Sequence, residues 1–140
     1  MRDLMNNIDL KRGISPAAAV ADNTPFVSQI ANMQGIAAAV FAIVTGALAD
    51  ADATFTVLIE HGDEANLSDA AAVGDEFLLG TEALAGFTFA GDDKVFKIGY
   101  VGPKQYVRVT ITPANNAGNA FVAGVWILEP LVRPTSNPPA

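Results

Sequence analysis

Few side chains in this sequence could perform acid–base or nucleophilic chemistry. His61 is the single histidine, and it stands directly before Gly62, Asp63 and Glu64. A serine–histidine–carboxylate triad would have to use this imidazole. No G-x-S-x-G motif accompanies it, and the adjacent acids indicate a solvent-exposed histidine in a turn. The absence of cysteine excludes thiol catalysis, disulfides and cysteine-based zinc sites. We therefore expect no enzymatic activity.

Paired carboxylates are the remaining acid–base candidates, because glycosidases use two carboxyl groups across a cleft. Four pairs are present: Asp50 with Asp52, Asp63 with Glu64, Asp75 with Glu76, and Asp92 with Asp93. All four lie in predicted turns, and the nearby Phe55, Phe87 and Phe89 fall in core-facing patterns. None of the acidic stretches matches a D-x-[DN]-x-[DN]-G calcium loop, and no phosphate-binding glycine motif occurs. The sequence predicts solvated acids, no metal and no cofactor.

Basic and aromatic residues gather between positions 97 and 108. One interpretation is a nucleic-acid-binding surface, in which bases stack on aromatic rings beside basic side chains. The basic residues would be Lys97, Lys104 and Arg108, and the aromatic ones Tyr100 and Tyr106. A net charge of −7 opposes binding to nucleic acid or to anionic membranes. We favour the alternative in which the two tyrosines pack across a hairpin turn and stabilise it.

Trp126 has two interpretations. It lies in a continuously apolar stretch, where it could anchor the core or meet another chain. Gly124, two residues earlier on the same face, leaves room for a neighbour to approach. The core position is the interpretation we favour.

The elements that position these residues are strands. Residues 54–60 and 107–112 alternate between apolar and polar side chains, which predicts strands with Val107, Val109 and Ile111 directed inward. Gly102 and Pro103 are expected to form the turn of a hairpin. Residues 37–44 and 121–130 are apolar throughout, as expected of buried strands.

The chain is therefore predicted to be an all-β protein, a single β-sandwich of the jelly-roll-like or immunoglobulin-like kind. Its 140 residues suffice for one domain with a core. Residues 1–25 mix single apolar residues, charges and two prolines, and predict an extended N-terminal arm. The sandwich should cover residues 26–130, and the proline-rich residues 131–140 should be a flexible C-terminal tail.

The charges are unevenly distributed along the chain. Residues 50–93 contain eleven acidic residues and no Lys or Arg, whereas Lys94, Lys97, Lys104 and Arg108 follow without an acid among them. Two oppositely charged faces of one sheet would explain this pattern. A self-complementary surface, on which the acidic part of one copy meets the basic part of the next, is the alternative.

A family resemblance rests on three stretches: "NNIDLKRGISPAAAVADNTPFVSQI", "TGALADADATFTVLIEHGD" and "LLGTEALAGFTFAGDDKVFKIGYVGPKQYVRVTITPANN". Together they resemble a family of small tailed-phage and prophage proteins that are encoded among phage head genes. The resemblance covers most of the chain and brings no catalytic motif. It implies a structural protein of the virion, above all a decoration (cement) protein on the outside of the capsid.

This resemblance sets the functional expectations. The protein should be made in the cytoplasm of a bacterial host, bind the major capsid protein and neighbouring copies of itself, and form a homo-oligomer on the capsid surface, without contacting nucleic acid or membrane. The expected contact residues are Ile8, Leu10, Lys11, Arg12, Ile14, Lys104, Tyr106 and Arg108. A head–tail joining or tail protein, and a carbohydrate- or receptor-binding head-fibre module, remain the alternative functions.

Overall fold

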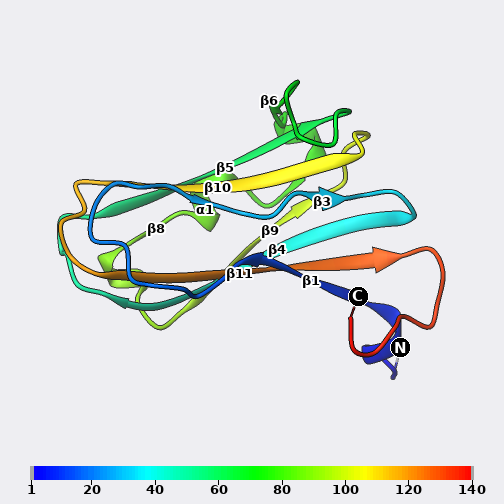
Figure 1. Ribbon diagram of the computed structural model, residues 1–140, viewed down its shortest axis with the longest axis horizontal. Helices are drawn as coiled ribbons and strands as arrows, with labels where there is room; N and C mark the ends of the chain where they lie inside the picture. Colours follow the sequence, from blue (N-terminus) through cyan, green and yellow to red (C-terminus); the bar gives the residue numbers. More distant parts are fainter. Residues whose placement is uncertain (1, 140) are drawn as a thin grey trace.

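The computed structural model describes residues 2–139 and consists of two antiparallel sheets packed face to face (Figure 1). The fold is thus the β-sandwich that the alternating and continuous apolar stretches predict. Met1 and Ala140, the outermost residues of the predicted arm and tail, lie outside the described residues. No helix among residues 2–139 is long and apolar enough to cross a membrane.

The first sheet, called sheet A, has the strand order β1-β11-β4-β9-β7. Its strands are β1 (Asp9–Ile14), β11 (Ala120–Pro130), β4 (Ile36–Leu48), β9 (Val95–Tyr100) and β7 (Leu78–Leu79). The long central pair β4 and β11 contains both predicted strands, residues 37–44 and 121–130. The inner faces of these two strands meet the core, and their outer faces also carry apolar side chains. This is why no apolar–polar alternation is visible in their sequences.

The second sheet, called sheet B, is built on β10 and β5. Short strands extend it at both edges, with β2 and β3 on β10 and with β6 and β8 on β5. The bounds are β2 (Phe26–Val27), β3 (Ala31–Asn32), β10 (Tyr106–Ala114), β5 (Thr54–Gly62), β6 (Ala71–Ala72) and β8 (Phe87–Thr88).

Short helical turns connect some of the strands. The 3-10 turns are η1 (Met5–Asn7), η2 (Asp75–Phe77) and η3 (Phe89–Gly91), and α1 (Glu82–Ala85) is an α-helical turn. The side chain of Thr81 caps α1 by accepting a hydrogen bond from the Leu84 amide at 3.1 Å. The turn α1 packs against β5 and β9, and η3 packs against β4 and β8.

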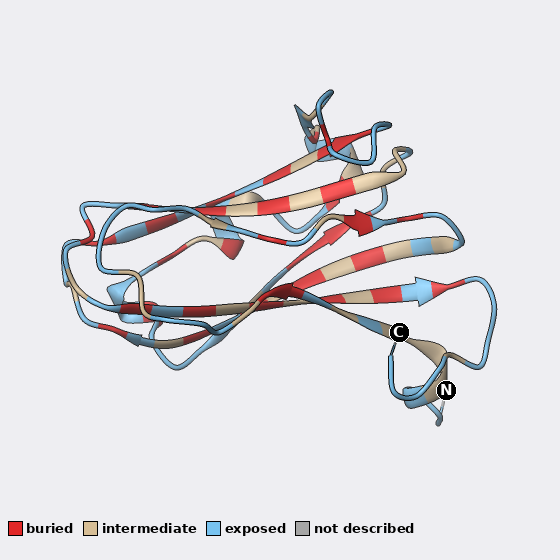
Figure 2. Ribbon diagram, in the orientation of Figure 1, coloured by how far each residue is buried: buried red, intermediate tan, exposed pale blue. Residues whose placement is uncertain are grey.

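The core lies between the sheets, and buried residues alternate with half-buried or exposed ones along β4, β10 and β11 (Figure 2). Its largest fully buried side chains are Trp126, Tyr100, Phe41, Phe55, Ile43, Ile59, Ile98, Ile111, Val107 and Val109. The inward direction of Val107, Val109 and Ile111 and the core position of Trp126 are thereby confirmed. Phe41 packs edge-on against Trp126 with ring centroids 4.8 Å apart.

Residues 100–113 do not form the predicted hairpin. Tyr100 ends β9 in sheet A, whereas Tyr106 begins β10 in sheet B, so Gly102 and Pro103 lie in a connection that crosses between the sheets. The two tyrosines therefore do not pack across a turn on one sheet. A hairpin and a crossover look alike locally, because both need a turn between two strands with alternating side chains.

The first 25 residues do not project as a separate arm. Residues 9–14 form β1, which pairs with β11 from Asp9 opposite Leu128 to Ile14 opposite Gly124. This pairing satisfies backbone groups that β11 would otherwise present at the edge of sheet A. The following segment continues along the sandwich, where Val20 forms a bridge with Ala120.

Candidate docking surfaces

His61 is buried and not exposed in a turn as the sequence suggested. It is 9% exposed, and its Nδ1 lies 2.8 Å from the phenolic oxygen of Tyr100. That oxygen accepts a hydrogen bond from the Lys104 amide at 3.2 Å, so the tyrosine hydroxyl is free to donate to Nδ1 of a neutral imidazole. Burial, followed by the charge of Lys104, lowers the pKa of His61. This arrangement stabilises the junction of the two sheets and presents no nucleophile.

The acidic residues hold loops together. Asp69 accepts hydrogen bonds from the amides of Asp63 and Glu64, and Asp50 accepts from the amides of Asp52 and Ala117. The Ala117 amide is the main cause that lowers the pKa of Asp50, and the Asp63 amide has the same effect on Asp69. Within residues 2–139, no group of three metal-ligating side chains could hold a metal ion.

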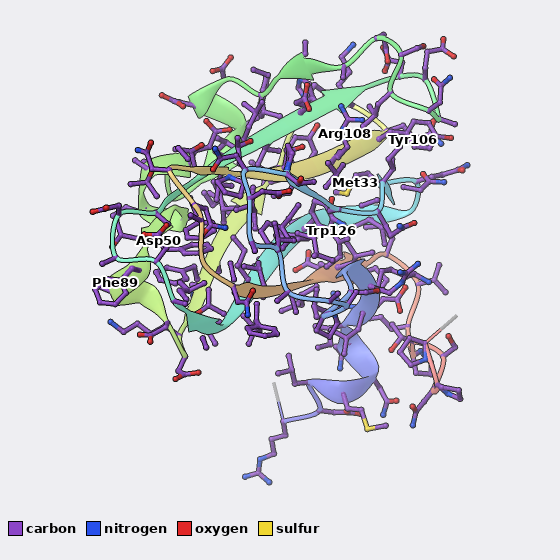
Figure 3. The ribbon with its side chains drawn as sticks, turned by 60° about the vertical axis from the view of Figure 1, so that its left-hand side comes forward. Met33, Asp50, Phe89, Tyr106, Arg108 and Trp126 are labelled. Atoms are coloured by element: carbon purple, nitrogen blue, oxygen red, sulfur yellow. The ribbon has the colours of Figure 1, made fainter. Side chains whose placement is uncertain are left out.

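The aromatic residues that a sugar-binding face would need are mostly inside the sandwich. Trp126 and Tyr100 are each 1% exposed, and Trp126 Nε1 donates to the Gln29 carbonyl at 3.1 Å. Figure 3 shows Trp126 between the sheets. Tyr106 is half-buried on sheet B, where the Gln105 amide contacts its hydroxyl at 3.2 Å. These three residues therefore form no exposed aromatic platform.

Lys104, Tyr106 and Arg108 belong to the sheet B side of the molecule. Lys104 pairs with Asp63 at 2.7 Å, and Arg108 pairs with Glu60 at 2.9 Å. Both cations are thus engaged within the chain. The outer face of sheet B around them is polar and rich in threonine, with Thr54, Thr56, Thr110 and Thr112.

The N-terminal candidates separate into two groups. Ile14 is 7% exposed and belongs to the core, so it cannot serve as a peg for a neighbour, and Lys11 is half-buried on the inner side of β1, where it contacts Asp9 at 3.5 Å. Ile8 is half-buried, and Leu10 and Arg12 are exposed. This second group faces a surface that another protein can reach, and the Lys11 side chain is also 37% exposed.

The outer face of sheet A is apolar across several strands, unlike that of sheet B. Leu10 lies opposite Ile127, which lies opposite Val40, and a second row runs from Arg12 through Val125 and Ala42 to Lys97. A third row joins Ala123, Val44 and Val95. Val44 and Val95 are 44% and 66% exposed. Large exposed apolar patches on soluble proteins mark interaction sites.

The two chain ends are held together beside this face. We call residues 2–8 and 131–139 the terminal clasp. The Thr135 amide donates to the Asn6 carbonyl at 3.0 Å, the Thr135 hydroxyl donates to the Ile8 carbonyl at 2.8 Å, and Arg133 Nη1 donates to Asn7 Oδ1 at 3.1 Å. Residues 131–139 therefore fold back along the N-terminal turn (Figure 1).

The terminal clasp exposes large apolar side chains. Leu4 is 60% exposed, Met5 62%, Leu131 70% and Val132 81%. Between the clasp and the outer face of sheet A is a hollow of about 260 Å³, lined among others by Leu4, Ile8, Val40, Leu79, Ile127 and Arg133. Its size suits one or two apolar side chains of a partner better than a cofactor. This end of the molecule is the stronger candidate for protein docking.

Sequence reasoning identified part of this surface and missed the rest. It singled out Ile8, Leu10 and Arg12, but not Leu4, Met5, Leu131 or Val132. The four additional residues come from opposite ends of the chain, so no local pattern indicates that the two segments lie side by side in the terminal clasp. The one available signal was the cluster of apolar side chains in two segments expected to lack sheet structure.

The sequence matches no protein-family model and no curated protein sequence. Solved structures with weak similarity include a family 22 carbohydrate-binding module of Clostridium thermocellum Xyn10B, with 11% identity over 94% of this chain and 92% of that one, at a TM-score of 0.41. The SPBc2 prophage-derived protein YomS has 11% identity over 86% of this chain and 94% of that one, at a TM-score of 0.37. VP2 of infectious bursal disease virus has 10% identity over 90% of this chain and 41% of that one, at a TM-score of 0.30.

Some similar chains are much longer than this one. The chain spans 26% of a larger Xyn10B chain and 34% of a family two carbohydrate esterase from Cellvibrio japonicus. TM-scores this low carry no argument about function. The sandwich fold follows from the strand pairing of this chain itself.

Proposed function

We propose that the protein is a non-enzymatic structural protein of a phage virion, a decoration protein that binds the assembled capsid. The terminal clasp is the observation that carries this proposal. It exposes Leu4 and Met5 on the N-terminal segment and Leu131 and Val132 on the C-terminal segment, and the binding of such groups to a partner removes apolar surface from water. The resemblance of the sequence to phage head-gene products indicates the partner.

The chemistry of the described residues supports a binding role over catalysis. His61 is engaged by Tyr100, and the acidic residues Asp50 and Asp69 are engaged by backbone amides. A decoration protein needs a stable body, an exposed contact surface and a soluble exterior. The acidic remainder of the surface suits the last requirement, because a net charge of −7 favours contact of the decorated particle with water.

The many identical sites on a capsid shell strengthen such a contact. Each copy needs only modest affinity if neighbouring copies also touch one another, because linked contacts raise the effective concentration. The hollow beside the clasp provides the specificity of the contact, since one partner side chain has to match its shape. Arg133 and Glu129 at its rim favour a partner with polar groups around an apolar centre.

Co-sedimentation with purified capsids tests this proposal. Leu131→Asp with Val132→Asp should abolish co-sedimentation, because it puts charges on the most exposed part of the clasp. Leu58→Asp is the matched control, since Leu58 is 39% exposed on the outer face of sheet B. Equal binding by both variants would refute docking through the clasp, and failure of the wild-type chain to bind capsids would refute decoration.

Binding experiments with the same purified capsids distinguish decoration from the alternative functions. A head–tail joining or tail protein would bind only at one vertex or to tails, which labelled protein reveals by electron microscopy. A carbohydrate-binding module would bind host polysaccharide and not bare capsids.

A further inference from the structure

Charge is distributed unequally over the surface of the folded protein. The outer face of sheet A and the terminal clasp together carry four of the eight basic residues but only two of the fifteen acidic ones. The four basic residues are Arg2, Arg12, Lys97 and Arg133, and the two acidic ones are Asp3 and Glu129. The rest of the molecule is therefore strongly acidic, and the apolar face is its cationic side.

The cationic centre of this face lies in one row of side chains. Arg12 and Lys97 stand at its two ends, with Val125 and Ala42 between them on the central strands. Among residues 2–139, the side chain of Arg12 donates a hydrogen bond to a neutral partner, the Ser15 hydroxyl, at 2.7 Å and forms no ion pair. No ion pair of Lys97 occurs within the described part of the chain. Both charges are thus available to carboxylates of another molecule.

A complementary surface lies at the end of the sandwich where η3 precedes β9. Phe89 is 42% exposed there, and Asp92 and Asp93 are exposed beside it in the sequence, followed by the exposed Lys94. The turn is held in place because the Thr88 hydroxyl accepts from the Ala90 amide and Gly91 is packed against Phe87 and Phe96. Figure 3 shows Phe89 at the same end as Asp50, remote from Tyr106 and Arg108. We call Phe89, Asp92 and Asp93 the acidic end.

We propose that the apolar, cationic outer face of sheet A binds the acidic end of a second copy of this chain. Phe89 then packs on the valine-rich strands, while Asp92 and Asp93 approach Arg12 and Lys97. Complementary charges of this kind fix the orientation of two partners and speed their association. A contact between two identical cationic faces would instead bring Arg12 and Lys97 near like charges.

Three strands at the edges of the sheets are poorly suited to self-association through strand pairing. β1 presents Lys11 and Arg12 along the edge of sheet A, and charged residues on an edge strand oppose pairing with another chain. β6 and β7 are only two residues long. Each copy carries both the cationic face and the acidic end, so the contact repeats and can close into a symmetric assembly.

Charge reversal with complementation tests this contact on the purified full-length chain. Arg12→Glu with Lys97→Glu should weaken self-association, measured by sedimentation velocity at several concentrations, on the order of a hundredfold. Asp92→Lys with Asp93→Lys should weaken it equally, although it lowers the net negative charge. An equimolar mixture of the two variants should associate again, because each supplies the charge that the other now lacks.

Glu64→Lys is the control, since this exposed acid lies in the loop after β5 and outside both surfaces. It should leave self-association unchanged, and added salt should weaken the wild-type contact. A wild-type chain that stays monomeric at all concentrations would overturn the proposal, as would association that survives both charge reversals or a mixture that does not recover. Because no capsid is present in this experiment, its result is independent of whether the chain decorates one.

Discussion

Gly124→Ala should destabilise the fold, because the ring of Phe41 occupies the space that a side chain at position 124 would need. A Cβ atom on Gly124 would meet Cζ and Cε1 of this ring, and one on Gly13 would meet the opposite side of the same ring. Phe41 is fully buried and packs edge-on against Trp126 with centroids 4.8 Å apart, so it cannot move without disturbing the core. Excess volume in a packed core costs about 1–3 kcal/mol.

The expected shift in melting temperature follows from the size of the chain. An unfolding entropy of about 2.1 cal/mol/K per residue over 140 residues corresponds to roughly 0.3 kcal/mol/K, so the Tm should fall by about 3–10 °C. Thermal and urea unfolding of Gly124→Ala provide the measurement. Ala123→Val adds volume on the outer face of the same strand and should stay within about 0.5 kcal/mol of wild type.

A double-mutant cycle then identifies the cause. In a Phe41→Leu background, Gly124→Ala should cost less than in the wild type, because the smaller side chain leaves room for the new methyl group. An unchanged cost would refute the steric explanation, and so would a Gly124→Ala protein as stable as wild type.

Three further predictions concern individual contacts. The folded-state pKa of His61 lies below its ordinary value of 6.5. The contribution of neutral His61 to stability is therefore complete above about pH 6.5 and is lost as the pH falls toward the folded-state pKa. Urea unfolding should show lower stability at about pH 5 than at about pH 8, and the difference should be smaller in His61→Gln. Tyr100→Phe leaves His61 Nδ1 and the Lys104 amide without a partner and should cost about 1–2 kcal/mol in the same assay, and a neutral result would contradict the buried pair. Thr135→Val should speed hydrogen exchange of the Asn7 amide in the N-terminal half of the clasp. It should change global stability by less than about 1 kcal/mol. Unchanged exchange would mean that the hydroxyl does not hold the clasp.

The sequence was sufficient for the fold class and for the direction of many side chains. Alternation at Val107, Val109 and Ile111 placed these residues inward because a strand directs successive side chains to opposite faces. Trp126 was correctly favoured as a core residue, although the neighbouring Gly124 makes room for Phe41 and not for another molecule.

Long-range partners could not be predicted from local patterns. His61 meets Tyr100 across 39 positions of sequence, and the adjacent acids wrongly suggested an exposed imidazole. The turn residues at Gly102 are as compatible with a hairpin as with the crossover between sheets that the structure contains. The clasp depends on contacts such as that of Thr135 with Ile8, which are 127 positions apart.

Phe89 shows the limit of periodicity in short elements. The pattern of Phe87 and Phe89 suggested two core-facing side chains, but the chain leaves the strand after Thr88 and forms a 3-10 turn. The turn sends Phe89 to the surface, whereas Phe87 stays buried and stacks on Phe55. The exposed ring is therefore a consequence of the strand ending early.

Counting the chain in purified virions tests the central claim most directly. On the proposed function, quantitative mass spectrometry of virions of a phage that carries this gene should find the protein at a ratio to the major capsid protein near one, or at a simple fraction of one. That result is expected because decoration repeats at equivalent sites over the whole shell. A handful of copies per particle would contradict decoration in favour of a connector or tail component, and complete absence would contradict a structural role in the virion.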